Sequence, residues 1–103
     1  MRGRRAPLTG SAPIFAALGD ETRLQIVTRI AARGPMSIVR LTAGTGMTRQ
    51  GVTKHLHVLS NASLVRGRRM GRERIWDLER ERLRAAGRSL ERISVQWMGL
   101  SVG

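Results

Sequence analysis

A pair of glycines between two helical patterns is the feature that most constrains how this chain folds. Gly44 and Gly46 separate a short apolar segment, residues 37–42, from a longer segment, residues 48–60. The longer segment repeats its apolar side chains at intervals of three and four residues, at Val52, Leu56 and Leu59. Such spacing is typical of an amphipathic helix, and glycines in a short connection permit a tight turn. The sequence therefore predicts two short helices joined by a tight turn.

The second of these helices has a polar face that is unusual for a helix needing only solubility. The side chains on this face are rich in hydrogen-bond donors and acceptors. A helix that needed only to be soluble would more often carry Glu, Lys and Ala there. The major groove of duplex DNA accepts one helix, and Arg and Gln can pair bidentately with guanine and adenine. The residues predicted to contact bases are Arg49, Gln50 and Thr53. Those predicted to contact the DNA backbone are Thr48, Lys54 and His57. A merely solvated helix side is the alternative interpretation.

A change of periodicity after residue 63 marks a second structural unit. Strand-forming residues at 64–65 and 75–78 flank the turn residues Met70-Gly71-Arg72, which predicts a β-hairpin. The hairpin is strongly basic, because five arginines lie within nine residues and only Glu73 opposes them. Phosphate oxygens are natural ligands for such a tip, although charge on an edge strand can also serve solubility alone. The hairpin residues predicted to contact DNA are Arg68, Arg69, Arg72 and Arg74.

Three further helices are predicted on either side of these units. The first spans Pro13–Leu18, and the second starts after Asp20 and stops at Gly34-Pro35. The last begins at Glu79, runs for roughly 18 residues to about position 98, and is followed by a frayed C-terminus at residues 99–103. Residues 1–12 are rich in Arg, Gly, Pro and Ser and are predicted to form a flexible basic arm. The side chains predicted to act as helix N-caps are Asp20, Ser37 and Thr48.

The charge balance favours a polyanionic partner. The 103 residues include 19 Lys plus Arg, all but one of them Arg, against 7 Asp plus Glu, which gives a net charge of +12. A single small basic domain of helical pattern indicates nucleic-acid binding first and membrane-surface binding second. Compositional bias toward Arg is the alternative, but these arginines cluster. No apolar run is long enough to cross a bilayer, and the N-terminus lacks a secretory pattern, so a cytoplasmic location is expected.

Three segments together resemble the ArsR-type winged helix-turn-helix regulators, in particular their metal-independent branch with an arginine-rich wing. These segments read LGDETRLQIVTRI, MTRQGVTKHLHVLSNASLV and GRRMGRERIWDL, and the resemblance covers about residues 13–97. It implies a mainly α fold with a small β-hairpin in which the first and last helices form a homodimer. The residues expected in that interface are Phe15, Leu18, Leu90, Ile93 and Trp97. Independently, these helices carry more apolar surface than so small a core can cover.

No metal, cofactor or catalytic site is predicted. The metal-sensing relatives carry paired cysteines in the helix before the turn, whereas the matching positions here are Ser37 and Val39, and the chain has no Cys. His55 and His57 are two apart on a helix and cannot clasp one ion within a monomer. His55 is predicted to be a hydrogen-bonded packing residue, with a phosphate contact as the alternative. No Ser/His/Asp arrangement suggests catalysis.

The predicted function is sequence-specific DNA binding by a dimeric, non-enzymatic repressor on an inverted-repeat operator. The sequence identifies no small-molecule effector. A basic protein-interaction module without sequence-specific DNA binding is the alternative. A peripheral membrane protein is disfavoured because the basic residues follow the turn and the hairpin rather than one amphipathic helix face. One local departure from the family is Ser63, where relatives have Gly; a left-handed backbone there would cost about 1 kcal/mol unless Asn61 takes the cap.

Overall fold

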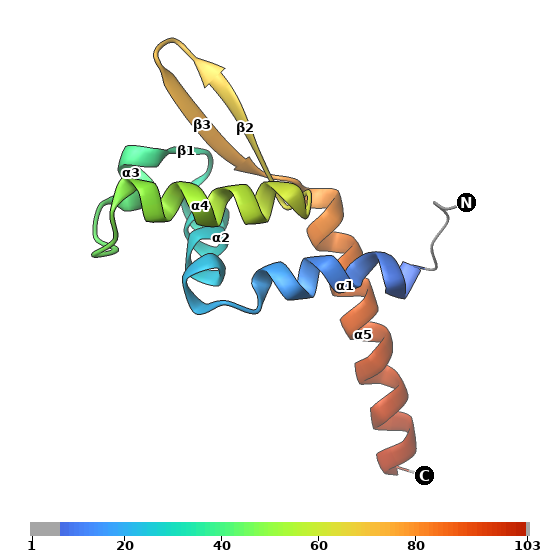
Figure 1. The fold of residues 1–103 in the computed structure, drawn as a ribbon. Coiled ribbons are helices and arrows are strands. Elements are labelled where there is room, and N and C mark those ends of the chain that lie inside the picture. The colour runs from blue at the N-terminus through green and yellow to red at the C-terminus, as the bar shows by residue number, and fades with distance from the viewer. Residues whose placement is uncertain (1–6, 103) are drawn as a thin grey trace.

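Figure 1 shows the fold in a computed structural model, which describes residues 7–102. Within that range the chain forms five helices and a three-stranded sheet. In chain order the elements are α1 (Pro7–Leu18), α2 (Glu21–Arg33), β1 (Met36–Ser37), α3 (Ile38–Thr42), α4 (Arg49–Asn61), β2 (Val65–Met70), β3 (Glu73–Leu78) and α5 (Arg80–Val102). The predicted mainly α architecture with a β-hairpin is confirmed.

The three predicted N-caps begin α2, α3 and α4. Asp20 accepts a hydrogen bond from the backbone N–H of Arg23 at 3.0 Å, and Thr48 accepts one from Gly51 at 3.0 Å. Ser37 accepts the corresponding bond from Arg40 at 3.3 Å. Each cap satisfies one of the N–H groups that the first turn of a helix leaves without a partner. These short side chains therefore determine where α2, α3 and α4 start.

The core lies beneath α4 and fixes its orientation. Val52, Leu56 and Leu59 are fully buried, which confirms the apolar stripe predicted for this helix. They belong to one cluster with the buried side chains of Leu41 on α3 and Ile26 on α2. Burying such side chains contributes about 1.5–3 kcal/mol each relative to leaving them exposed. The opposite, polar side of α4 consequently faces away from the core.

The sheet is antiparallel, in the order β1-β3-β2. Gly71, with φ at +62°, is the first of the two residues between the hairpin strands, where a two-residue turn of type II′ favours glycine. β1 was not predicted, because two residues are too few to show the alternating pattern of a strand. Its residues Met36 and Ser37 pair with Trp76 and Ile75. They attach the base of the hairpin to the segment between α2 and α3.

Both terminal helices are longer than predicted. α1 begins at Pro7, six residues before the predicted start, so Pro13 lies inside the helix and residues 7–12 are not part of an arm. The hydroxyls of Ser11 on α1 and Ser89 on α5 are 3.0 Å apart and buried, so packing against α5 holds this first part of α1. The remainder of the predicted arm, residues 1–6, lies outside the described residues. α5 likewise continues through the expected frayed end to Val102.

Candidate nucleic-acid interface

The residues predicted to read DNA lie on the side of α4 that faces away from the core. Thr48, Arg49, Gln50, Lys54 and His57 are exposed. Thr53 is half-buried, and its hydroxyl donates a hydrogen bond to the carbonyl oxygen of Arg49 at 2.7 Å. Its methyl group and its oxygen lone pairs therefore remain for a ligand, whereas its hydrogen is already used. The six side chains form one polar surface that begins at the N-terminus of α4.

The hairpin projects from the helical body beside α4 (Figure 1). The four arginines predicted to contact DNA are all exposed, but they do not share one face. Arg69 and Arg74 are direct cross-strand partners, and Arg74 lies two residues from Trp76, so these three side chains lie on the same face. Arg68 pairs with Ile75 on the opposite face, and Arg72 lies in the turn. The basic hairpin thus has two charged faces.

Trp76 anchors the base of the hairpin, a role that the sequence interpretation missed. Its side chain is only 5% exposed, and it lies between its strand partners Met36 and Gly67. A Cβ at Gly67 would lie 3.0 Å from the Trp76 ring, so only glycine leaves room for the indole. The guanidinium of Arg74 lies 5.5 Å from the centre of the same ring, a cation–π contact. The sequence does contain a signal for this anchoring role, because Trp76 is the single aromatic residue of the hairpin.

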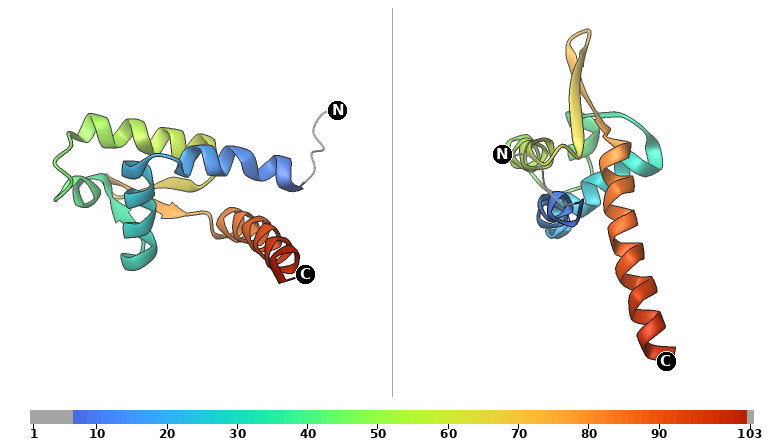
Figure 2. Two further views of the ribbon diagram at one scale, coloured as in Figure 1. Left: turned by 90° about the horizontal axis from the view of Figure 1, so that it is seen from below. Right: turned by 90° about the vertical axis from the view of Figure 1, so that its right-hand side faces the viewer.

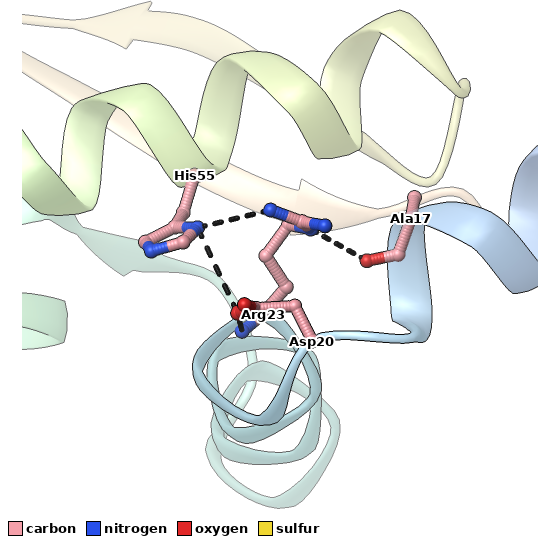
Figure 3. A network of polar contacts seen from close by, with 4 residues as sticks. All are labelled: Ala17, Asp20, Arg23 and His55. Atoms are coloured by element: carbon pink, nitrogen blue, oxygen red, sulfur yellow. Dashed lines mark hydrogen bonds and ion pairs between the residues drawn. The ribbon is translucent and has the colours of Figure 1, made fainter.

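A polar network joins the middle of α4 to the junction of α1 and α2 (Figure 3). Arg23 donates through Nε to the carbonyl of Ala17 at 2.6 Å, and its Nη1 lies 3.3 Å from Nδ1 of His55. The same Nδ1 lies 3.9 Å from Oδ2 of Asp20. The backbone N–H of Arg23, donating to the Asp20 carboxylate, lowers the pKa of that group below its ordinary value. The prediction that His55 is a hydrogen-bonded packing residue is confirmed.

Arg29 holds the turn that precedes α4. Its guanidinium donates to the carbonyl oxygens of Ala43 at 2.9 Å, and of Leu41 and Arg40 at 3.3 Å. These carbonyls belong to the C-terminal end of α3 and the following turn, where a helix leaves acceptors without partners. Arg29 therefore connects α2 to the turn between α3 and α4. Sequence spacing could not reveal this contact, because the acceptors are backbone groups more than ten residues away.

The predicted interface residues fall into two groups. Phe15 and Leu18 on α1 are half-buried and pack against the core. Leu90, Ile93 and Trp97 on α5 are respectively 55%, 55% and 66% exposed. The C-terminal part of α5 extends beyond the rest of the molecule, as the right-hand view of Figure 2 shows. A single chain therefore leaves a strongly apolar helix surface uncovered.

Neither of the two positions that the sequence resemblance matches to metal-binding cysteines carries a metal ligand here. Ser37 is buried and caps α3, and Val39 is exposed. Within residues 7–102 no three His, Asp or Glu side chains come together as a metal site would require. None of the helices in that range combines the length and the apolar character needed to cross a bilayer.

Comparisons with known proteins agree with this architecture. Residues 18–68 match the family described as a helix-turn-helix domain. The uncharacterized HTH-type transcriptional regulator YuzN of Bacillus subtilis (strain 168) is 36% identical over 77 residues, which are 69% of this chain and 84% of that protein. An ArsR-like transcriptional regulator from Rhodococcus sp. RHA1 superimposes with a TM-score of 0.76 at 34% identity, covering 92% of this chain and 89% of the other.

A third similarity concerns the fold alone. The homodimeric winged helix-turn-helix DNA-binding domain from Mycobacterium bovis has a TM-score of 0.65 at 24% identity, covering 98% of this chain and 90% of that one. The order of helices, the short turn before α4 and the hairpin after it are the parts of a winged helix-turn-helix unit. The sequence identity and the coverage of the Bacillus and Rhodococcus proteins show that this chain shares their family as well as the fold. This chain therefore belongs to the ArsR family of winged helix-turn-helix proteins and is a DNA-binding transcriptional regulator, not an enzyme.

Proposed function

We propose that the chain is a cytoplasmic repressor that binds an inverted-repeat operator as a homodimer. The observation that carries this proposal is the outward polar face of α4 beside an arginine-rich hairpin. A helix of this kind fits the major groove, and a twofold dimer would set two such helices about one turn of DNA apart. The proposed partner is therefore double-stranded DNA with two related half-sites.

The side chains divide by the contacts their chemistry favours. Arg49 and Gln50 are exposed in the first turn of α4 and are proposed to hydrogen-bond to base edges, with the methyl group of Thr53 beside them. The side chains proposed to grip the DNA backbone are Thr48, Lys54, His57, Arg68, Arg69, Arg72 and Arg74. Base contacts determine which sequence is bound, whereas backbone contacts set affinity and its dependence on salt.

The proposed dimer joins the terminal helices of two chains. The exposed apolar side chains of α5 support it, because monomeric proteins rarely leave such a surface uncovered. The structural neighbour from Mycobacterium bovis is described as homodimeric, and α1 and α5 have counterparts within the share of that chain that superimposes. The residues proposed for the interface are Phe15, Leu18, Leu90, Ile93 and Trp97.

Selection from a random pool of duplexes, followed by gel shifts over a salt series, tests the DNA-binding proposal. We expect one enriched sequence with inverted half-sites, bound more tightly than unrelated duplex at every salt concentration. The DNA upstream of the protein's own coding region is the first natural candidate to compare. Equal affinity for all duplexes would contradict a sequence-specific operator. Binding of no duplex at all would favour the protein-interaction alternative.

Repression itself needs a transcription measurement. A reporter promoter that contains the selected sequence is transcribed in vitro with and without the protein. We expect transcription to fall in proportion to operator occupancy, and to be unaffected when the half-sites are scrambled. A rise in transcription would identify an activator instead.

A further inference from the structure

A groove between α4 and the hairpin has the lining expected of an anion site. It encloses about 430 Å³ and is lined by Ile38, Thr53, His57, Ser60, Arg74 and Trp76. None of these six residues is acidic, and two of them carry nitrogen atoms that bind phosphate oxygens. The groove thus receives side chains from the recognition helix on one side and from the hairpin on the other.

Arg74 is held in place before any ligand arrives. Its guanidinium lies 5.5 Å from the centre of the Trp76 ring, and that ring is itself fixed between two neighbouring strands. Most surface arginines lose considerable rotamer entropy when they bind, whereas a stacked planar guanidinium loses less. Trp76 is therefore a positioning residue for Arg74, and Gly67 is the position that makes room for the indole.

The strand pairing of Arg74 is a second observation that points to an anion. Arg69 lies directly opposite Arg74 on the same face of the hairpin. Like charges in this position repel and destabilise a sheet. Among the described residues neither arginine has a carboxylate within ion-pair distance. An anion beside both guanidinium groups would turn this repulsion into attraction.

We propose that the groove holds one phosphate of the DNA backbone, contacted from α4 by His57 and from the hairpin by Arg74. This inference rests on the proposed DNA binding, because α4 in a major groove would leave the adjoining sugar-phosphate strand between α4 and the hairpin. Ser60 supplies a further hydroxyl donor at the same place. Arg69 contributes charge from the neighbouring strand. The other basic residues contact different phosphates or bases.

Single-position neutralisation of the DNA backbone tests this assignment. The probe is the duplex selected from the random pool, with one phosphate at a time replaced by an uncharged methylphosphonate. Wild-type protein should lose affinity when any contacted phosphate is neutralised, and the loss should be about tenfold at the one position of each half-site that depends on both Arg74 and His57, which we call the groove phosphate. Arg74→Gln and His57→Ala should each bind the fully charged duplex about tenfold more weakly. Both variants should also become insensitive to neutralisation of that one phosphate.

Two control variants sharpen the result. Arg68→Gln removes an arginine from the opposite face of the hairpin and should keep full sensitivity to the groove phosphate. Arg74→Lys keeps the charge, so the slope of log affinity against log salt should stay close to the wild-type value. For Arg74→Gln the magnitude of this slope should fall by about 1. Both Arg74 variants change an exposed side chain, and their melting temperatures verify that the fold is retained.

Different outcomes separate this inference from the proposed function. The groove assignment is overturned, while DNA binding stands, if the Arg74 and His57 variants become insensitive to neutralisation of different phosphates. The same holds if Arg74→Gln keeps the wild-type sensitivity at every phosphate. If Arg68→Gln also becomes insensitive to neutralisation of the groove phosphate, Arg68 contacts that phosphate too, and the assignment of the groove to the Arg74 face of the hairpin is overturned. If the wild-type protein selects no duplex, the proposed function fails and the groove assignment fails with it.

Discussion

Ser63 adopts a left-handed backbone conformation, with φ at +61°, two residues after the end of α4. The family's glycine at this place has no Cβ and tolerates the conformation, whereas a serine is strained by about 1 kcal/mol. The strain expected from the sequence is therefore present, and Asn61 does not replace Ser63 in this role. Ser63→Gly should raise the free energy of unfolding by about 0.5–1 kcal/mol, measured by urea denaturation. Ser63→Ala, which keeps the Cβ, should show no gain.

Gly67 is a second position where the absence of a side chain matters. A Cβ there would lie 2.8 Å from Nε of Arg74 and 3.0 Å from two ring atoms of Trp76. Because Trp76 is buried and cannot easily move, Gly67→Ala should lower the free energy of unfolding by about 1–3 kcal/mol. Gly87 on α5 has open space around it. Gly87→Ala should instead stabilise the protein by about 0.5–1 kcal/mol. Urea denaturation of both variants measures the two changes, with Gly87→Ala as the matched control.

Asp20 should make stability depend on pH in the acid range. Its pKa is lowered in the folded protein, chiefly because its carboxylate accepts the backbone N–H of Arg23. The stabilisation is therefore complete above the unfolded pKa, near pH 4, and is lost as the pH falls through the lower folded value. Melting temperatures measured from about pH 6 to pH 3 should fall more steeply for the wild type than for Asp20→Asn. Parallel curves would show that another carboxylate dominates.

At the scale of whole elements, Arg29 is expected to order the turn between α3 and α4. Arg29→Met keeps much of the side-chain volume but removes donors to three backbone carbonyls. The loss should amount to about 1–3 kcal/mol of unfolding free energy. The rate of amide hydrogen exchange should rise more at residues 43–47 than in α5. Arg33→Met, at an exposed position in the last turn of the same helix, should leave both measurements unchanged.

Elements with strong local signals were predicted correctly, and those that depend on distant partners were not. α2 and α4 have short polar N-caps and a regular apolar stripe, so their existence and their starts followed from sequence. The hairpin followed from strand-forming residues around Gly71. By contrast, β1 exists only because Met36 and Ser37 pair with β3. The sequence predicts an arm where the first half of α1 lies, because the contact of this half with α5 joins residues 78 positions apart in the sequence.

For the whole molecule, the exposed surface of α5 should decide the oligomeric state. Trp97 is 66% exposed in the single chain, so Trp97→Glu should not disturb the fold of one subunit. In the proposed dimer it would place a charge in an apolar interface at a cost of several kcal/mol. Sedimentation velocity should show a dimer for the wild type and a monomer for the variant. The monomer should also bind the selected duplex more weakly, because the half-sites are no longer linked.

Glu91→Gln on the same helix is the control for that experiment. Glu91 is exposed and polar, and its replacement by an isosteric neutral side chain leaves the apolar surface intact. Its sedimentation should match that of the wild type. If Trp97→Glu remains dimeric with unchanged DNA affinity, the proposed interface through α5 is wrong.

Sequence alone determined the basic charge, the absence of thiol ligands, the starts of α2, α3 and α4, and the positions of the two candidate DNA-contact segments. These properties depend on residue identity or on partners within a few positions, so local rules suffice for them. The tertiary structure decided what depends on distant partners. It placed Arg74 on Trp76 and opposite Arg69, joined Arg23 to His55, and aimed Arg29 at the turn before α4. Such contacts form only when packing brings separate segments together, and no spacing in the chain records them.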